Sequence, residues 1–246
     1  MQYLKEYTKL TSQEKRQNFY KRLFKKNYPR WDDSMVLLTK LFSKYAKNKS
    51  SILDAGCGNG NWIIDELPHK FNRKVGIDVN KQVVRKNTTL EKIIYGGIDK
   101  MPFEDKEFDN VVSLWVLEHV KNPDKVFAEI SRVLKNEGYF GFVTPNKNYF
   151  LILLKQLFSQ TLNNAVVEKF YGRKHIDIFP TFYMSNNLKE IGEIANKNGF
   201  KIVYLKENFD PSYTSFNSLS FLVSKLLYKV RISFFNAHII CLLQKV

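Results

Sequence analysis

Apolar residues in the first fifty positions recur at three- and four-residue steps, as they do along one face of a helix. The pattern predicts two amphipathic helices, over 11–26 and 32–46, which we expect to form an N-terminal helical lid within residues 1–50. The apolar stripes of these helices contain Phe19, Leu23, Met35, Leu38 and Phe42.

From residue 51 onward, short apolar runs alternate with helical patterns. Alternation of this kind predicts an α/β fold, a mostly parallel seven-stranded sheet with helices on both faces. The last run has no helical pattern before it to return it in parallel, so we expect the last strand to be antiparallel. The predicted strands cover 51–55, 74–78, 92–95, 108–114, 138–144, 200–205 and 237–244, and the predicted helices cover 61–66, 81–88, 124–134 and 186–198.

The turn after the first predicted strand is rich in glycine. Asp54 closes that strand, and Gly56, Gly58 and Gly60 follow at alternate positions, where they let the backbone bend sharply or approach a ligand. Asp78 ends the second strand, where a carboxylate can accept both hydrogen bonds of a ribose diol. The glycine spacing differs from the dinucleotide fingerprint, and no triphosphate-binding Gly-Lys-Ser/Thr is present. The layout favours a nucleoside ligand without a pyrophosphate.

Residues 53–60 resemble motif I of the class I S-adenosylmethionine-dependent methyltransferases. The likeness continues in segments whose order and spacing match the branch with quinone-biosynthesis, sugar and secondary-metabolite methyltransferases. It implies a Rossmann-like fold, S-adenosylmethionine as cofactor, S-adenosylhomocysteine as product and a small-molecule acceptor. The later segments are 101–109, 117–120, 130–134 and 143–146.

The resemblance divides the chain into three parts. Residues 1–50 would form the lid, and residues 51–146 the cofactor-binding core. Residues 147–246 would add acceptor-side insertion helices and the last two strands of the same domain.

Ligands of open α/β sheets bind beyond the carboxyl ends of the strands, which gives the first two turns specific roles under the resemblance. Asp54 and the amides of the three glycines would hold the methionine part of the cofactor. Asp78 would accept the ribose hydroxyls, and Val79 would lie against the adenine. The alternatives are a turn acid for Asp54 and a helix-capping acid for Asp78.

The third and fourth turns complete the expected cofactor site. Where relatives commonly carry an acid, this chain has Gly97. Ile98 would still offer its backbone amide to the adenine. Asp99 is either a ligand or a solvated loop acid. Leu114 and Trp115 would lie beside the sulfonium.

Two histidines are candidate catalytic residues, because an imidazole can accept a proton near neutral pH. His119, next to the acid Glu118, is either a general base or a packing residue. His175 lies in a segment, 171–183, that combines cationic and aromatic groups.

In that segment, Arg173 and Lys174 would clamp an acceptor anion, with His175 or Tyr183 near the reacting atom. The alternative is an aromatic plug that only holds the lid. No pattern of metal ligands is present, so we expect no metal.

The net charge of +15 is unevenly distributed, at +9 over residues 1–50, zero over 51–150 and +6 over 151–246. The excess fits either an anionic partner or a dispersed basic surface. An RNA or tRNA methyltransferase is therefore the alternative function, although Ser-Leu-Trp-Val stands where an Asn-Pro-Pro-Tyr-type motif would be expected. A non-catalytic protein that keeps the cofactor fold is a further alternative.

The remaining expectations concern location and partners. Two distant cysteines, Cys57 and Cys241, and the lack of an apolar signal core indicate a cytoplasmic protein. No apolar run reaches the length of a membrane span. We expect no stable nucleic-acid complex, and peripheral membrane contact and the oligomeric state stay open.

Overall fold

The computed structural model describes residues 11–85, 87–157 and 180–246. The chain forms two compact units, here called the helical unit and the sheet unit. The helical unit consists of Met1–Asp33, Lys147–Pro180 and Phe209–Ala237, and the sheet unit consists of Ser34–Asn146, Thr181–Asn208 and His238–Val246.

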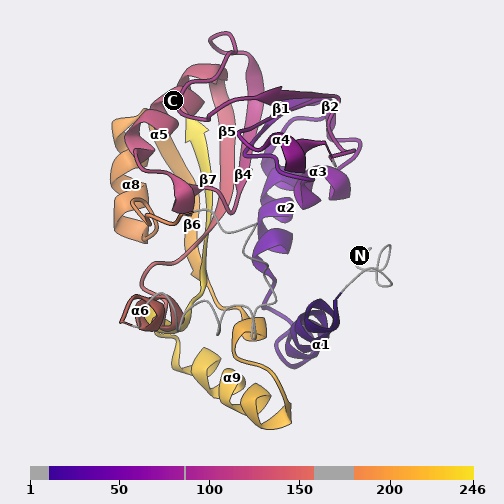
Figure 1. The fold of residues 1–246 in the computed structure, drawn as a ribbon, viewed down its shortest axis with the longest axis vertical. Coiled ribbons are helices and arrows are strands. Elements are labelled where there is room, and N and C mark those ends of the chain that lie inside the picture. The colour runs from indigo at the N-terminus through magenta and orange to yellow at the C-terminus, as the bar shows by residue number, and fades with distance from the viewer. Residues whose placement is uncertain (1–10, 86, 158–179) are drawn as a thin grey trace. The chain divides into compact units, whose positions relative to one another are not determined.

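The sheet unit is built on a seven-stranded sheet (Figure 1). Its strands are β1 (Ser50–Ala55), β2 (Phe71–Asp78), β3 (Lys92–Tyr95), β4 (Phe108–Leu114), β5 (Leu134–Pro145), β6 (Phe200–Asn208) and β7 (His238–Lys245). Their order is β3-β2-β1-β4-β5-β7-β6. The pairs from β3 to β5 are parallel, whereas β7 is antiparallel to both of its neighbours. The predicted Rossmann-like sheet with an antiparallel last strand is confirmed.

Helices cover both faces of this sheet (Figure 1). Helices α5 (Pro123–Val133) and α8 (Leu188–Lys197) pack on one face, and α2 (Ser34–Tyr45) and α3 (Trp62–Glu66) on the other. Alternate residues of β7 enter the two cores, for example Cys241 in the first and Leu242 in the second. Burial on both faces explains why the strand sequences are nearly continuous apolar runs.

The helical unit has its own aromatic core. Its helices are α1 (Ser12–Asn27), α6 (Phe150–Leu157) and α9 (Ser218–Val230), with the short turns η4 (Pro211–Tyr213) and η5 (Ser233–Phe235). Thr11 caps α1, since its hydroxyl accepts the amide of Glu14 and the Glu14 carboxylate accepts the amide of Thr11. The core side chains are Tyr20, Phe24, Trp31, Phe209 and Phe221.

The structure departs from the predicted elements in three places. Helix α2, expected in the lid, packs on the sheet through Leu38 and Phe42. The helix predicted over 81–88 is shorter in the structure, where α4 covers Lys81–Val84. Beyond it, the side chain of Asn87 accepts a hydrogen bond from the backbone amide of Thr89, a local pairing that competes with helical hydrogen bonds. Helices α6 and α9 were not predicted.

Candidate functional site

The carboxyl ends of the parallel strands form one edge of the sheet. Strands β1 and β4 are parallel neighbours there although they are not consecutive in the chain. The order in which strands are added to the sheet therefore reverses at β1, with β2 and β3 on one side of it and β4 and β5 on the other. In open α/β sheets, such a switch point is where ligands bind.

The glycine turn after β1 is packed against the strands on both sides. Gly56 has φ of +83°, and a Cβ at this residue would lie 2.4 Å from the side chain of Val116. Its amide donates to the carbonyl of Ile77 at 2.8 Å. Only glycine fits this turn without strain or displacement of a neighbour.

Asp54 is a buried acid at the start of this turn. Its side chain is 1% exposed, and its Oδ2 has no hydrogen-bond partner among the described residues. Burial raises the pKa of Asp54 to about 8, against a hydrogen bond from Asn61 and with support from the carboxylates of Asp78 and Asp65. A buried carboxylate without a cation is costly, so this position fits a cationic group of a ligand, such as an ammonium group.

Asp78, at the end of β2, is held by two backbone amides. Its Oδ2 accepts the amide of Gly58 at 2.9 Å, and its Oδ1 accepts the amide of Asn80 at 2.8 Å. Each carboxylate oxygen can accept a second hydrogen bond, so the group is oriented and still able to bind a diol. The next residue, Val79, is 54% exposed, as an apolar contact for a ligand ring requires.

The turn after β3 places a carboxylate over the glycine that departs from the family pattern. The Oδ1 of Asp99 lies 2.6 Å from the position that a Cβ on Gly97 would take. The two side chains could not occupy this space together. The carboxylate of Asp99 therefore occupies the space that the side chain of an acid at position 97 would take. Ile98 packs against the apolar core.

The segment after β4 turns sharply at Trp115, which has φ of +59°. Its amide donates to the carbonyl of Val143 at 3.0 Å, and Leu114 before it is half-buried. The Trp115 ring packs against His238, with 4.6 Å between ring centroids and 69° between ring planes. The edge of the sheet therefore carries an indole and an imidazole in contact.

His238 is a candidate site residue that the sequence did not reveal. It begins β7 opposite Pro145 at the end of β5. Because β7 runs antiparallel to β5, β7 starts at the edge of the sheet where β5 finishes. The side chain is buried, and its Nδ1 lies 3.1 Å from the hydroxyl of Ser34. That hydroxyl also accepts a hydrogen bond from the side-chain amide of Asn208 at 3.1 Å.

The turn η2 (Leu117–His119) contains the predicted pair Glu118 and His119. The Glu118 carboxylate is buried, accepts the hydroxyl of Thr144 at 3.3 Å, and lies 3.9 Å from Nε2 of His119. Its carbonyl accepts the amides of Phe182 at 2.7 Å and Tyr183 at 3.3 Å. The structure thus brings the backbone of Tyr183 beside the turn η2.

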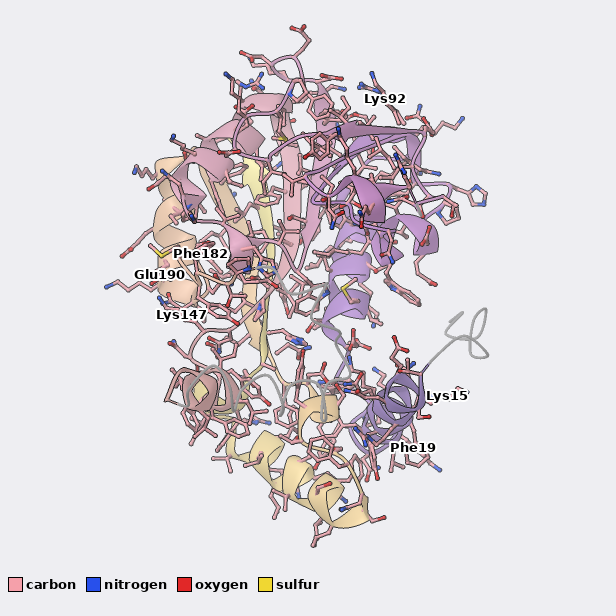
Figure 2. All side chains as sticks on the ribbon, in the orientation of Figure 1. Lys15, Phe19, Lys92, Lys147, Phe182 and Glu190 are labelled. Carbon is pink, nitrogen blue, oxygen red and sulfur yellow. The ribbon has the colours of Figure 1, made fainter. Side chains whose placement is uncertain are left out.

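The ring of Phe182 is partly exposed beside this turn (Figure 2). The Nζ of Lys121 lies 5.1 Å from its centroid, which is within the range of a cation–π contact. The other predicted acceptor residues, Arg173, Lys174 and His175, lie outside the described residues.

In the described parts of the chain, no three His, Cys, Asp or Glu side chains gather as metal ligands. No helix there is long and apolar enough to cross a membrane.

Comparison with known proteins agrees with this geometry. Residues 53–142 match the family model described as a methyltransferase domain. The fold is similar to an S-adenosylmethionine-dependent methyltransferase of Mesorhizobium loti, with a TM-score of 0.59, 13% identity, and coverage of 87% of this chain and 98% of that one. Residues 53–142 thus carry a methyltransferase domain, and the fold around it is that of S-adenosylmethionine-dependent methyltransferases, which points to S-adenosylmethionine as the cofactor.

Sequence relatives differ in what they methylate. An uncharacterized protein of Methanocaldococcus jannaschii is 26% identical over 75% of this chain and 73% of its own length. The 24-methylenesterol C-methyltransferase 2 of Arabidopsis thaliana is 28% identical over 67% of this chain and 45% of its own. A Bacillus subtilis protein provisionally named as a 23S rRNA (guanine-N1) methyltransferase is 29% identical over 49% and 44%. This chain therefore matches less than half the length of the Arabidopsis thaliana and Bacillus subtilis relatives.

Proposed function

We propose that this methyltransferase acts on a small-molecule acceptor, with cofactor and acceptor bound side by side at the carboxyl edge of the sheet. The observation that carries the cofactor half is the buried Asp54 carboxylate, whose Oδ2 has no partner among the described residues. Asp78, on the adjacent strand, is fixed by two amides and keeps room for further hydrogen bonds.

Each anchor has a distinct role in this proposal. Asp54 pairs with the ammonium group of the methionine part, and Asp78 accepts the ribose hydroxyls. Val79 covers the adenine, Asp99 accepts a hydrogen bond from the amino group of the adenine, and Ile98 donates its backbone amide to an adenine nitrogen. When bound, S-adenosylmethionine supplies an electrophilic methyl group on a sulfonium.

The amides of the glycine turn have more limited roles. In the structure, the Gly56 amide donates a hydrogen bond to the carbonyl of Ile77, and the Gly58 amide donates one to the carboxylate of Asp78. Gly56 therefore serves mainly by its shape, and Gly58 acts through Asp78. The proposal that Gly60 approaches the ligand rests on the lack of a Cβ at that position.

The acceptor half is assigned to the residues after β4 and at the start of β7. Trp115, beside Leu114, would exclude water from the reacting atoms, because methyl transfer depends largely on alignment and desolvation. His119 or His238 would take the proton of a hydroxyl or amine acceptor. Arg173, Lys174, His175 and Tyr183 stay in the proposal as contacts to an anionic acceptor.

The second candidate acceptor is RNA. The net charge of +15 and the rRNA-methyltransferase name of one relative favour it. The aromatic and imidazole rings at the sheet edge, Trp115 and His238, fit a compact acceptor. We therefore rank the small molecule first.

Transfer of isotope from methyl-labelled S-adenosylmethionine into a cell extract would test the proposal. The extract is separated after reaction into polar metabolites, lipids, protein and RNA. The proposal expects label in the metabolite or lipid fraction with the wild type, and none with Asp78→Ala. Label that accumulates only in RNA would replace the small-molecule acceptor with the second candidate.

A further inference from the structure

Helix α9 of the helical unit has two apolar faces. One is buried, where Phe221 and Tyr228 pack in the aromatic core and the hydroxyl of Ser224 bonds that of Thr214 at 2.8 Å. The other face is exposed and consists of aliphatic side chains. Their exposed fractions are 72% for Leu219, 49% for Leu222, 47% for Val223, 54% for Leu226 and 53% for Val230.

These five side chains form one continuous stripe. At about 100° per residue, the steps of three and four between them keep the whole set within an arc of roughly 100°. The helix has 13 residues and is about 20 Å long. Two further apolar side chains continue past its end, Ile232 with 50% exposure and Phe234 with 44%.

Cationic side chains border the stripe, and acids are missing from this part of the sequence. Lys225 and Lys229 lie on one side of it, and Arg231 follows the helix. The Lys225 Nζ lies 5.5 Å from the centroid of the Phe221 ring. Between residues 211 and 246 the sequence contains no Asp or Glu. The face is thus apolar in the middle and cationic along one side and at its end.

We propose that α9 binds the surface of an anionic lipid bilayer. The helix lies in the plane of the interface, the aliphatic stripe enters the acyl region, and Lys225, Lys229 and Arg231 pair with lipid phosphates. A helix with an aliphatic face, cationic flanks and too little length to span is the usual form of such an anchor. This inference does not depend on which acceptor is methylated.

The charge pattern selects this occupant over two others. A second copy of the chain would bring the same cationic side chains against each other, and residues 211–246 contain no acid to pair with them. RNA would bind the cations but would gain little from the aliphatic stripe, because bases stack on aromatic side chains. A bilayer with anionic headgroups satisfies both the stripe and its flanks.

Co-sedimentation with vesicles tests the proposal with the full chain. The vesicles are phosphatidylcholine alone, or phosphatidylcholine with about one third phosphatidylglycerol. We expect the wild type to partition onto anionic vesicles at least about tenfold better than onto neutral ones. Leu222→Asp with Leu226→Asp should reduce that partition about tenfold, as should Lys225→Glu with Lys229→Glu.

Matched changes on the sheet unit serve as controls. Leu188→Asp changes a leucine that is 37% exposed at the start of α8, and Lys201→Glu changes an exposed lysine of β6. Both should leave partition unchanged. A fluorophore at Leu226→Cys should shift to the blue with anionic vesicles, whereas one at Leu188→Cys should not. The native Cys57 and Cys241 are buried, so labelling is specific.

Three results would overturn the proposal. One is partition that the α9 variants leave unchanged, or that is no greater on anionic than on neutral vesicles. Another is a stable dimer in solution that Leu226→Asp splits, since a second copy would then occupy the stripe. The third is tRNA binding that the paired lysine substitutions abolish and that excludes vesicles.

Discussion

Trp115 and His238 pack ring against ring, with 4.6 Å between their centroids, although they lie in different halves of the chain. The contact exists because β7 enters the sheet antiparallel beside β5, so its first residue lies where β4 and β5 end. Ser34, which begins α2, fixes the other side of the imidazole at 3.1 Å. The imidazole is thereby oriented beside the residue expected to line the reacting centre.

Replacing His238 should affect the acceptor more than the cofactor. Once an acceptor is known, His238→Ala should lower kcat/KM for it about tenfold or more, about 1.4 kcal/mol of transition-state stabilisation. The Kd for S-adenosylhomocysteine should change less than about twofold, a few tenths of a kcal/mol. His69→Ala, at an exposed position, is the matched control. An equal loss of cofactor affinity in His238→Ala would move the residue into the cofactor site.

Cofactor affinity should depend on pH through Asp54. The buried carboxyl has a pKa of about 8 in the cofactor-free protein, so it is mostly protonated at pH 6. Pairing with the ammonium group requires its ionised form, and binding below pH 8 must then release a proton. Affinity for S-adenosylhomocysteine should therefore rise between pH 6 and pH 8, by at most about tenfold per pH unit.

Titration calorimetry in buffers of different ionisation enthalpy measures this release directly. Asp54→Asn should bind more weakly and without proton release. The same shift predicts that Asp54 destabilises the cofactor-free fold as pH rises from about 4 to 8, because the native state holds the extra proton in that window. Proton release that persists unchanged in Asp54→Asn would assign it to another group.

Asp99 should act in place of the missing acid at position 97. Asp99→Ala should weaken S-adenosylhomocysteine binding by about tenfold, as expected for loss of a hydrogen bond to a charged group. Adding Gly97→Asp to that variant should restore affinity, since the Cβ at 97 no longer meets the Asp99 carboxylate at 2.6 Å. Titration calorimetry on the two variants decides the point. Wild-type affinity in Asp99→Ala would make Asp99 a loop acid.

The helical unit should depend on the ammonium group of Lys21, whose side chain is 26% exposed and which pairs with two carboxylates. Lys21 Nζ lies 2.6 Å from Asp33 and 2.9 Å from Asp210, whose side chain is 3% exposed. Burial alone would lower the pKa of Lys21, but the two carboxylates outweigh it and raise the pKa. Asp210→Asn should therefore cost about 3 kcal/mol of unfolding free energy.

Chemical denaturation measures that loss. Asp32→Asn is the control, because the Lys25–Asp32 pair is more exposed, at 37% and 14%, than the Lys21–Asp210 pair, at 26% and 3%, and more exposed pairs contribute less. A loss of the same size in both variants would show that burial of the Lys21 group is not what matters.

The sequence predicted the strands and the cofactor turns because both depend on local patterns. Apolar runs placed β3 and β4 at the residues where the structure has them. The sequence missed α9 because two apolar faces and a buried Ser224 hide a simple helical period. It missed His238 because the order of strands in the sheet, which brings His238 to Trp115, is not a local property.

The roles that the sequence suggested for residues at the sheet edge remain predictions. The structure adds two observations: the Oδ2 of Asp54 has no hydrogen-bond partner among the described residues, and the side chain of Asp99 lies over Gly97. The spacing of residues in the sequence could reveal neither. Both depend on burial and on side-chain direction. Such features emerge only when the strands are assembled.

The account rests on cofactor binding at the ends of β1 and β2, and titration of S-adenosylhomocysteine into wild type and Asp78→Ala tests it most directly. We expect micromolar binding to the wild type, and a loss of about 1.5–3 kcal/mol on substitution, because charge-assisted hydrogen bonds to the diol are removed. Asp105→Ala, at an exposed carboxylate, should bind as the wild type does. Equal affinity in Asp78→Ala and wild type, or no binding to either, would contradict the proposed site.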